Sequence, residues 1–110
     1  MKMPNNEQSF VADNKIEKYL LSDTHEEGKH KAAFFKQFGF DALEPENLKK
    51  SLLNHAVTRE IVNELEVAHG KKYVLECELQ TPDERNPCIK SVWIIGNEES
   101  NPRLVTAYPK

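Results

Sequence analysis

The sequence lacks long apolar runs, and this excludes a membrane-spanning helix. No uninterrupted apolar stretch in the 110 residues is longer than the four residues of Val92–Ile95, whereas a helix needs about 20 apolar residues to cross a bilayer. The first ten residues are polar and contain no apolar segment of the kind found in secretory signals. We therefore expect a cytoplasmic protein without a membrane partner.

An excess of positive charge is also missing. The formal net charge is −3 and the isoelectric point is near 5.8, whereas proteins dedicated to duplex DNA are usually strongly basic because they neutralise phosphates. We expect no duplex-DNA partner. Basic residues do gather locally, and they predict either a small basic pocket or an ordinary solvated helix face: Lys29, Lys31, Lys36, Arg103 and Lys110.

Cysteine and metal-binding patterns are sparse. A hairpin loop centred near Glu84 would place the sulfurs of Cys77 and Cys88 about 10 Å apart, which is too far for a disulfide, so we expect two reduced thiols. His25 and His30 lie five residues apart, and no zinc-type spacing is present. Glycine-rich nucleotide loops and nucleophile elbows are absent as well, so we expect no cofactor and no metal.

The remaining pattern predicts one α+β domain over residues 13–110, preceded by a flexible segment over residues 1–12. Helices come first and a meander of strands follows, which indicates helices packed on one face of a three- to four-stranded antiparallel sheet. A short extended piece at Phe10 and Val11 is the expected fourth strand. The main elements are expected over residues 13–21 and 29–38 as helices, and over 72–80, 89–95 and 103–108 as strands.

Residues 45–69 allow two interpretations. Glu44 and Pro45 mark a helix start, and an apolar stripe continues as far as Gly70. This stripe predicts either one long helix or two helices separated near Val57 and Thr58, whose low helix propensity favours the break.

Two groups of polar residues are candidates for a site. The first precedes and opens the second helix, where Gly28 and Lys29 are expected to bind an anion at the helix start, and it includes His25 and Lys31. The second lies on the last strand and contains Arg103, Thr106 and Tyr108. These residue types suit metal-independent cleavage of RNA: histidine moves a proton, a cation stabilises the phosphorane, and tyrosine stacks a base or donates a proton.

Each candidate also has an ordinary structural explanation. Tyr108 next to Pro109 is typical of a half-buried strand aromatic, His25 lies in a polar turn that favours solvation or capping, and Thr106 is a good strand former. Three phenylalanines within Phe34–Phe38 are interpreted as core residues rather than as a cofactor site.

Several motifs resemble a small bacterial family catalogued only as a domain of unknown function. The similarity extends from Asp13 to Pro109 and rests on four segments: Lys15-x-x-x-Tyr19-Leu20-Leu21-Ser22, Gly28-Lys29-x-Lys31-Ala32-x-Phe34-Phe35-x-x-x-Gly39-Phe40, His69-Gly70-x-Lys72-Tyr73, and Pro102-Arg103-Leu104-Val105-Thr106-Ala107-Tyr108-Pro109. This resemblance implies a family but no activity.

The closing strand is also similar to the last strand of bacterial toxin ribonucleases of the RelE, barnase, EndoU and colicin types. That resemblance implies a toxin-type endoribonuclease, or a degenerate relative of one, that acts on RNA through His25, Lys31, Arg103, Thr106 and Tyr108. The chain departs from these toxins in being acidic. The alternative hypothesis is a non-catalytic interaction module, toxin-neutralising or regulatory, that binds a cognate protein partner, for which exposed sheet edges are suitable.

Overall fold

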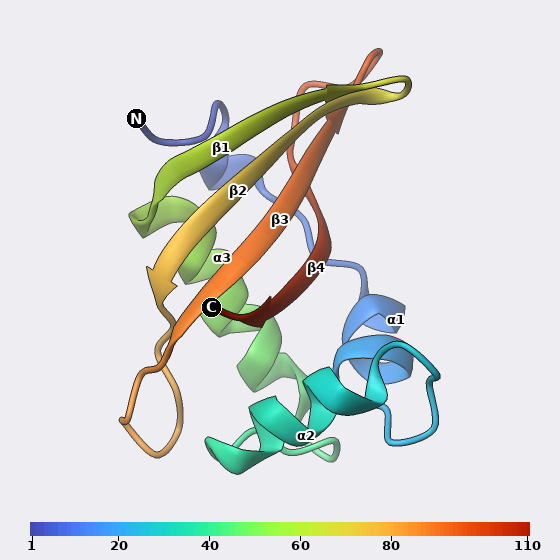
Figure 1. The fold of residues 1–110 in the computed structure, drawn as a ribbon, viewed down its shortest axis with the longest axis vertical. Coiled ribbons are helices and arrows are strands. Elements are labelled where there is room, and N and C mark those ends of the chain that lie inside the picture. The colour runs from blue at the N-terminus through green and yellow to red at the C-terminus, as the bar shows by residue number, and fades with distance from the viewer.

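The computed structural model describes residues 1–110 as an α+β fold, with three helical regions followed by a four-stranded antiparallel meander (Figure 1). The strand order is β1-β2-β3-β4. The elements are η1 (Asn6–Gln8), α1 (Asp13–Lys15) continuing as η2 (Ile16–Leu20), α2 (Lys29–Gln37), α3 (Pro45–Thr58), β1 (Glu60–Val67), β2 (Gly70–Glu78), β3 (Cys88–Gly96) and β4 (Arg103–Pro109). The predicted fold class is confirmed.

The core lies between the helices and one face of the sheet. Trp93 on β3 and Phe35 on α2 are its largest fully buried side chains, and Leu52 on α3 packs in the same cluster. The predicted core role of the phenylalanine-rich helix is correct for Phe35, while Phe34 packs against the cluster from a partly buried position. No helix has the length and apolar character needed to cross a membrane.

The predicted helix in the second half of residues 45–69 is wrong. The helix α3 ends at Thr58, Arg59 is extended, and Glu60–Val67 forms β1 instead. The helical spacing was misleading because Val62 and Leu65 of the apolar stripe are exposed rather than buried, while β-branched residues at 61, 62 and 67 suit a strand. The fourth strand is therefore β1, and Phe10 adds only a single parallel bridge to Arg103.

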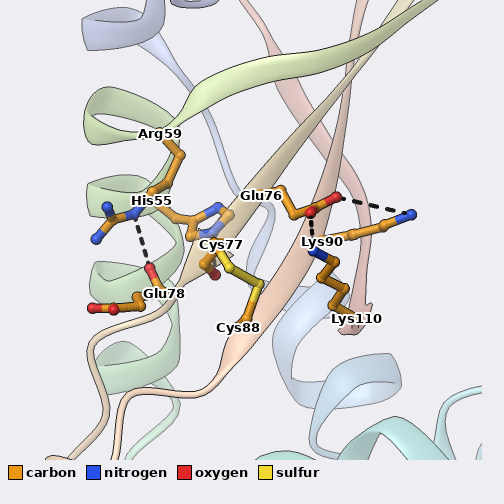
Figure 2. Close-up of a disulfide and its surroundings, with 8 residues drawn as sticks. All are labelled: His55, Arg59, Glu76, Cys77, Glu78, Cys88, Lys90 and Lys110. Atoms are coloured by element: carbon orange, nitrogen blue, oxygen red, sulfur yellow. Dashed lines mark hydrogen bonds and ion pairs between the residues drawn. A yellow bond between two sulfur atoms is a disulfide. The ribbon is translucent and has the colours of Figure 1, made fainter.

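The two cysteines form a disulfide, which corrects the expectation of reduced thiols (Figure 2). The register places Glu78 opposite Cys88 and Cys77 opposite Ile89, so the hairpin loop is longer than the sequence indicated. The Cα atoms of the cysteines are consequently 4.2 Å apart. The cysteines give no support to the expected cytoplasmic location, since disulfides persist mainly where conditions are oxidising.

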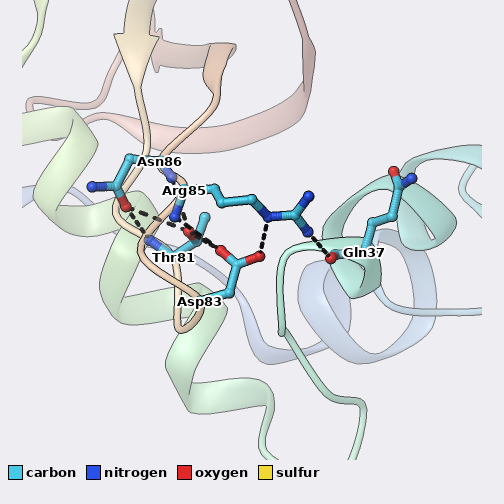
Figure 3. A network of polar contacts seen from close by, with 5 residues as sticks. All are labelled: Gln37, Thr81, Asp83, Arg85 and Asn86. Atoms are coloured by element: carbon cyan, nitrogen blue, oxygen red, sulfur yellow. Dashed lines mark hydrogen bonds and ion pairs between the residues drawn. The ribbon is translucent and has the colours of Figure 1, made fainter.

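The longer loop is stabilised by its own polar residues (Figure 3). The backbone amide of Thr81 donates to the side-chain oxygen of Asn86 at 2.9 Å, and the Thr81 hydroxyl donates to Asp83 at 2.8 Å. Arg85 pairs with Asp83 and also donates to the carbonyl of Gln37 at 2.6 Å. These bonds use polar groups of the loop backbone and connect the loop to the end of α2. They explain why the loop is longer than expected and why Glu78, rather than Gln80, lies opposite Cys88.

The first twelve residues lie against the rest of the chain. Met3 and Val11 are buried, and the carbonyl of Met1 accepts a hydrogen bond from the amide of Ile61 at 2.8 Å. The flexibility expected for this segment in solution stays a prediction.

Candidate functional site

A pocket of about 500 Å³ lies where the first helical region and the loop before α2 meet β4. Figure 1 shows the ribbon of α1 next to β4, with α2 below both. Val105 has no residue opposite it on β3, because Val92 pairs with Thr106 and Trp93 pairs with Leu104. This β-bulge, a feature that often re-aims side chains beside functional sites, lies where β4 borders the pocket. The lining residues are Asn14, Lys15, Lys18, Tyr19, His25, Glu27, Val105 and Thr106.

Tyr19 is the residue that joins the two groups of candidates. It lies in the π-helical turn η2. Such turns are rare in proteins, and those that occur are frequently found at functional sites. Lys31 donates to the Tyr19 hydroxyl oxygen at 2.7 Å, and the hydroxyl is 2.9 Å from that of Thr106. The ring of His25 packs edge-on against the Tyr19 ring with centroids 4.9 Å apart. Lys31, His25 and Thr106 thus converge on one phenol.

The surroundings of Tyr19 act on its acidity in opposite directions. Partial burial raises the pKa of the phenol, but the hydrogen bonds with Lys31 and Thr106 and the positive charge of Lys31 lower it. The net result is a pKa below the ordinary tyrosine value. A phenol with a lowered pKa beside a cation gives up its proton more readily, which suits a group that transfers protons.

His25 is held in one tautomer by the turn that contains it. Its Nδ1 accepts hydrogen bonds from the amides of Glu27, at 3.1 Å, and Gly28, at 2.9 Å. The proton of the neutral ring is therefore on Nε2, which has no hydrogen-bond partner within the protein. In this arrangement His25 can donate a hydrogen bond to a ligand, but it cannot accept a proton unless Nδ1 leaves the two amides.

The predicted anion-binding residues have other contacts in the structure. The amide of Gly28 points to His25, and the amide of Lys29 donates to the His25 carbonyl at 2.9 Å. A Cβ atom on Gly28 would collide with the carbonyl oxygen of Tyr19. Glycine is therefore required here for close packing of the loop on η2. Anion binding at these amides stays a prediction that would require His25 to move.

Arg103 and Tyr108 do not line the pocket. Arg103 pairs with Ile94 in the sheet and its Nε is 3.6 Å from a carboxylate oxygen of Glu99. Tyr108 lies two residues beyond Thr106 on β4, opposite Lys90. The structure therefore brings three of the five predicted catalytic residues together and leaves these two outside the cluster.

Sequence reasoning missed Tyr19, Lys15 and Lys18. In the sequence, Tyr19 stood out only as part of the family-like motif Lys15-x-x-x-Tyr19. Residues four apart share a helix face, and the Lys15 ammonium is 5.4 Å from the Tyr19 ring centroid. The spacing of Lys15 and Tyr19, together with the neighbouring Lys18, was the sequence signal that could have indicated this part of the site.

The pocket has the chemistry of an anion-binding site. Lys15 and Lys18 line it, Lys31 lies behind the Tyr19 hydroxyl, and Glu27 is the single acidic residue in the lining. Nowhere in the chain do three or more histidine, cysteine, aspartate or glutamate side chains gather closely enough to hold a metal ion.

Comparison with known proteins places the chain in a family. A model described as a domain of unknown function, DUF6883, matches residues 2–110. The chain belongs to the DUF6883 family. This membership confirms the resemblance to a domain of unknown function. No curated protein matches the chain.

A solved structure shares the DUF6883 fold seen here. The match is to a chain of a "Contact-dependent growth inhibition toxin - immunity protein complex from Klebsiella pneumoniae 342", with a TM-score of 0.70 and 18% sequence identity. The match covers 91% of this chain and 98% of the other. At this identity the similarity concerns the fold.

Proposed function

We propose that this DUF6883 domain is a toxin-type endoribonuclease that cleaves RNA without a metal ion at the pocket around Tyr19. The observation that carries the proposal is the hydrogen-bonded row Lys31–Tyr19–Thr106 at a pocket lined by two lysines and His25. It combines a phenol of lowered pKa, cations that suit a phosphate and a hydrogen-bond donor, which are the groups that phosphodiester cleavage in RNA requires.

The proposed reaction begins with the 2′-hydroxyl of the RNA. Its oxygen attacks the adjacent phosphorus as Tyr19, in its phenolate form, takes the hydroxyl proton. The bond from phosphorus to the 5′ oxygen then breaks, and the same proton passes from Tyr19 to that leaving oxygen. The products are a 2′,3′-cyclic phosphate and a free 5′-hydroxyl, so atoms and charge balance without a further reactant.

The neighbouring residues have separate roles in this proposal. Lys31 stabilises the phenolate, because it already donates to the Tyr19 oxygen at 2.7 Å. Lys15 and Lys18 neutralise the phosphate, and the Nε2–H of His25 donates to a phosphorane oxygen, where fixed donors act most strongly. Thr106 orients Tyr19 through its hydroxyl.

Arg103 and Tyr108 are assigned to RNA binding beyond the reacting bond. Tyr108 lies on the same strand as Thr106 and is partly exposed, so it is suited to stacking on an unpaired base. Arg103 would exchange its ion pair with Glu99 for a phosphate, which its planar guanidinium binds well. The likeness to a chain of a toxin–immunity complex supports this toxin-type proposal at the level of fold.

The test is incubation of the purified protein with RNA in excess EDTA. The expected result is RNA fragments that end in 2′,3′-cyclic phosphate, and a variant with Lys15→Ala and Lys18→Ala that cuts more slowly with a raised KM. A charge-matched control with Lys2→Ala and Lys50→Ala, which lie outside the pocket, should cut normally. RNA that stays intact with the wild-type protein would reject the proposal.

A second candidate function is a non-catalytic module that binds a cognate protein. It is favoured by the net charge of −3, which suits a basic partner, and by the fold match to a chain from a toxin–immunity complex. It predicts stable co-purification with a second chain, intact RNA, and harmless expression in bacteria. An active ribonuclease should instead be toxic when expressed without its antidote.

A further inference from the structure

The strand β1 forms one edge of the sheet, and only its first part is protected. The amide of Ile61 donates to the carbonyl of Met1, and the Met1 ammonium pairs with Glu60. The register shifts between Ile61 and Asn63, so Val62 forms a β-bulge. A covering segment and a bulge are two devices that block pairing with another chain. Both devices end at Val62.

The rest of the edge, Asn63–Val67, has neither device. It pairs with β2 on one side only and contains no proline and no lysine. Leu65 and Val67 are 47% and 37% exposed on it. An edge strand with unpaired backbone groups and exposed aliphatic side chains is a template for an added strand.

The charge on this edge is of one sign. The only charged residues of β1 are Glu60, Glu64 and Glu66. Glu64 pairs with Lys71 across the hairpin at 2.7 Å, whereas Glu66 has no ion pair. Opposite charges on neighbouring strands stabilise a sheet and like charges destabilise it, so the added strand should be basic.

A second copy of the chain that pairs through its own β1 does not meet this requirement. Two copies that form one continuous sheet are related by a two-fold axis perpendicular to it, and residues on the same face then lie opposite each other. An axis at Glu64 or at Glu66 pairs that glutamate with itself, and an axis at Leu65 pairs Glu64 with Glu66 twice. Every register centred on these residues therefore opposes like charges.

We propose that the edge of β1 over Asn63–Val67 binds an extended segment of a partner protein in which lysine or arginine alternates with aliphatic residues. The basic side chains lie opposite Glu64 and Glu66, the aliphatic ones lie opposite Leu65, and backbone hydrogen bonds extend the sheet. This surface is independent of RNA cleavage, because it involves no residue of the Tyr19 pocket.

The test uses an acetylated seven-residue peptide of alternating lysine and valine, titrated into the isotopically labelled full-length protein and followed by NMR. Amide shifts should concentrate on residues 62–67. Glu64→Gln with Glu66→Gln should weaken binding roughly two- to thirty-fold, the loss expected for two charged cross-strand pairs. The matched control, Glu7→Gln with Glu46→Gln on other surfaces, should bind as the wild type does.

N-methylation separates strand addition from simple charge attraction. Successive amides of a strand point to opposite edges, so the lysine amides of the peptide face one edge and the valine amides face the other. Methylating either set blocks one edge only, and the two methylated peptides have equal charge. One of them should bind as the parent does and the other should not. Equal binding of both, shifts away from β1, no binding at millimolar peptide, or dimerisation of the protein through β1 would each overturn the proposal.

Discussion

Two histidines of this molecule have the same tautomer and opposite surroundings. His55 on α3 is fully buried, and its Nε2 donates to the carbonyl of Cys77 at 3.1 Å, so its Nδ1 accepts from the Ser91 hydroxyl at 2.8 Å. Ser91 in turn accepts from the Trp93 indole. In His25 the Nδ1 is likewise an acceptor, from two backbone amides, but the Nε2–H has no protein partner.

The difference lies in what the second nitrogen faces. For His55 every hydrogen-bonding group is used inside the core, and burial lowers its pKa to about 4, aided by the charge of Arg59. Such a histidine stabilises the folded state in its neutral form and is unavailable to a ligand. For His25 one donor remains beside a pocket, so the ring is available for binding. A histidine's role therefore follows from its unsatisfied nitrogen more than from its position in the sequence.

The largest expected difference concerns activity. We predict that His25→Ala lowers the RNA-cleavage rate about 10²- to 10³-fold, the usual effect of removing one donor to a developing oxyanion, and changes the free energy of unfolding by about 1 kcal/mol or less. Cleavage assays and urea unfolding measure the two quantities. A large loss of stability with normal cleavage would make His25 a second structural histidine.

The reverse result is predicted for the buried ring. We expect His55→Ala to lower the free energy of unfolding by about 3–5 kcal/mol, because it leaves a cavity and removes the partners of the Cys77 carbonyl and Ser91. The folded fraction should cleave RNA at the wild-type rate. A shift in urea midpoint no larger than that of His25→Ala would contradict the assigned role.

The pH dependence of stability tests the buried ring of His55. Because the pKa of His55 is about 4 when folded and near 6.5 when unfolded, the unfolded chain binds the proton first. The stabilisation is complete above pH 6.5 and is lost as the pH falls toward 4, by roughly 3 kcal/mol. At each pH, the free energy of unfolding of wild type minus that of His55→Gln isolates the contribution of His55 from that of the carboxylates. A difference that does not vary with pH would argue against a buried neutral ring.

The smallest effect concerns the disulfide between Cys77 and Cys88. The carbonyl of Cys77 is the one that accepts the hydrogen bond from His55. The two cysteines are 11 residues apart, and for a loop of this length we predict that Cys77→Ser with Cys88→Ser costs about 2–3 kcal/mol. The nearby ion pair of Glu76 with Lys110 at 2.7 Å lies outside the loop (Figure 2). Its hydrogen bond from Lys110 lowers the pKa of Glu76, and that shift should survive in the double variant. Unchanged thermal stability would show that the crosslink does not constrain the unfolded chain.

The parts of the fold that were predictable had two local signals that agreed. Pro45 together with the apolar spacing marked α3, and the apolar run over 92–95, which contains three β-branched residues, marked the strand expected over 89–95. The strand β1 was missed because its exposed apolar residues happened to have helical spacing. The disulfide was missed because the loop register depends on side-chain bonds of Thr81 and Asn86 that sequence spacing does not encode.

The same reasoning applies to the site. His25, Lys31 and Thr106 were selected by chemistry, and the structure joins them, but the joining residue Tyr19 had no predicted role beyond its place in a family-like motif. Its position depends on a π-helical turn and on Gly28 packing against its backbone, neither of which has a reliable sequence signal. Arg103 and Tyr108 were selected by the same chemistry, but their positions on β4 leave them outside the pocket.

The most direct measurement is the rate of RNA cleavage by Tyr19→Phe in excess EDTA, compared with wild type at equal folded concentration. The variant keeps the ring that contacts His25 and removes only the hydroxyl bound by Lys31 and Thr106. We predict a loss of about 10²- to 10⁴-fold, as for removal of a group that transfers a proton. Cleavage at the wild-type rate would show that Tyr19 is not the centre of the site.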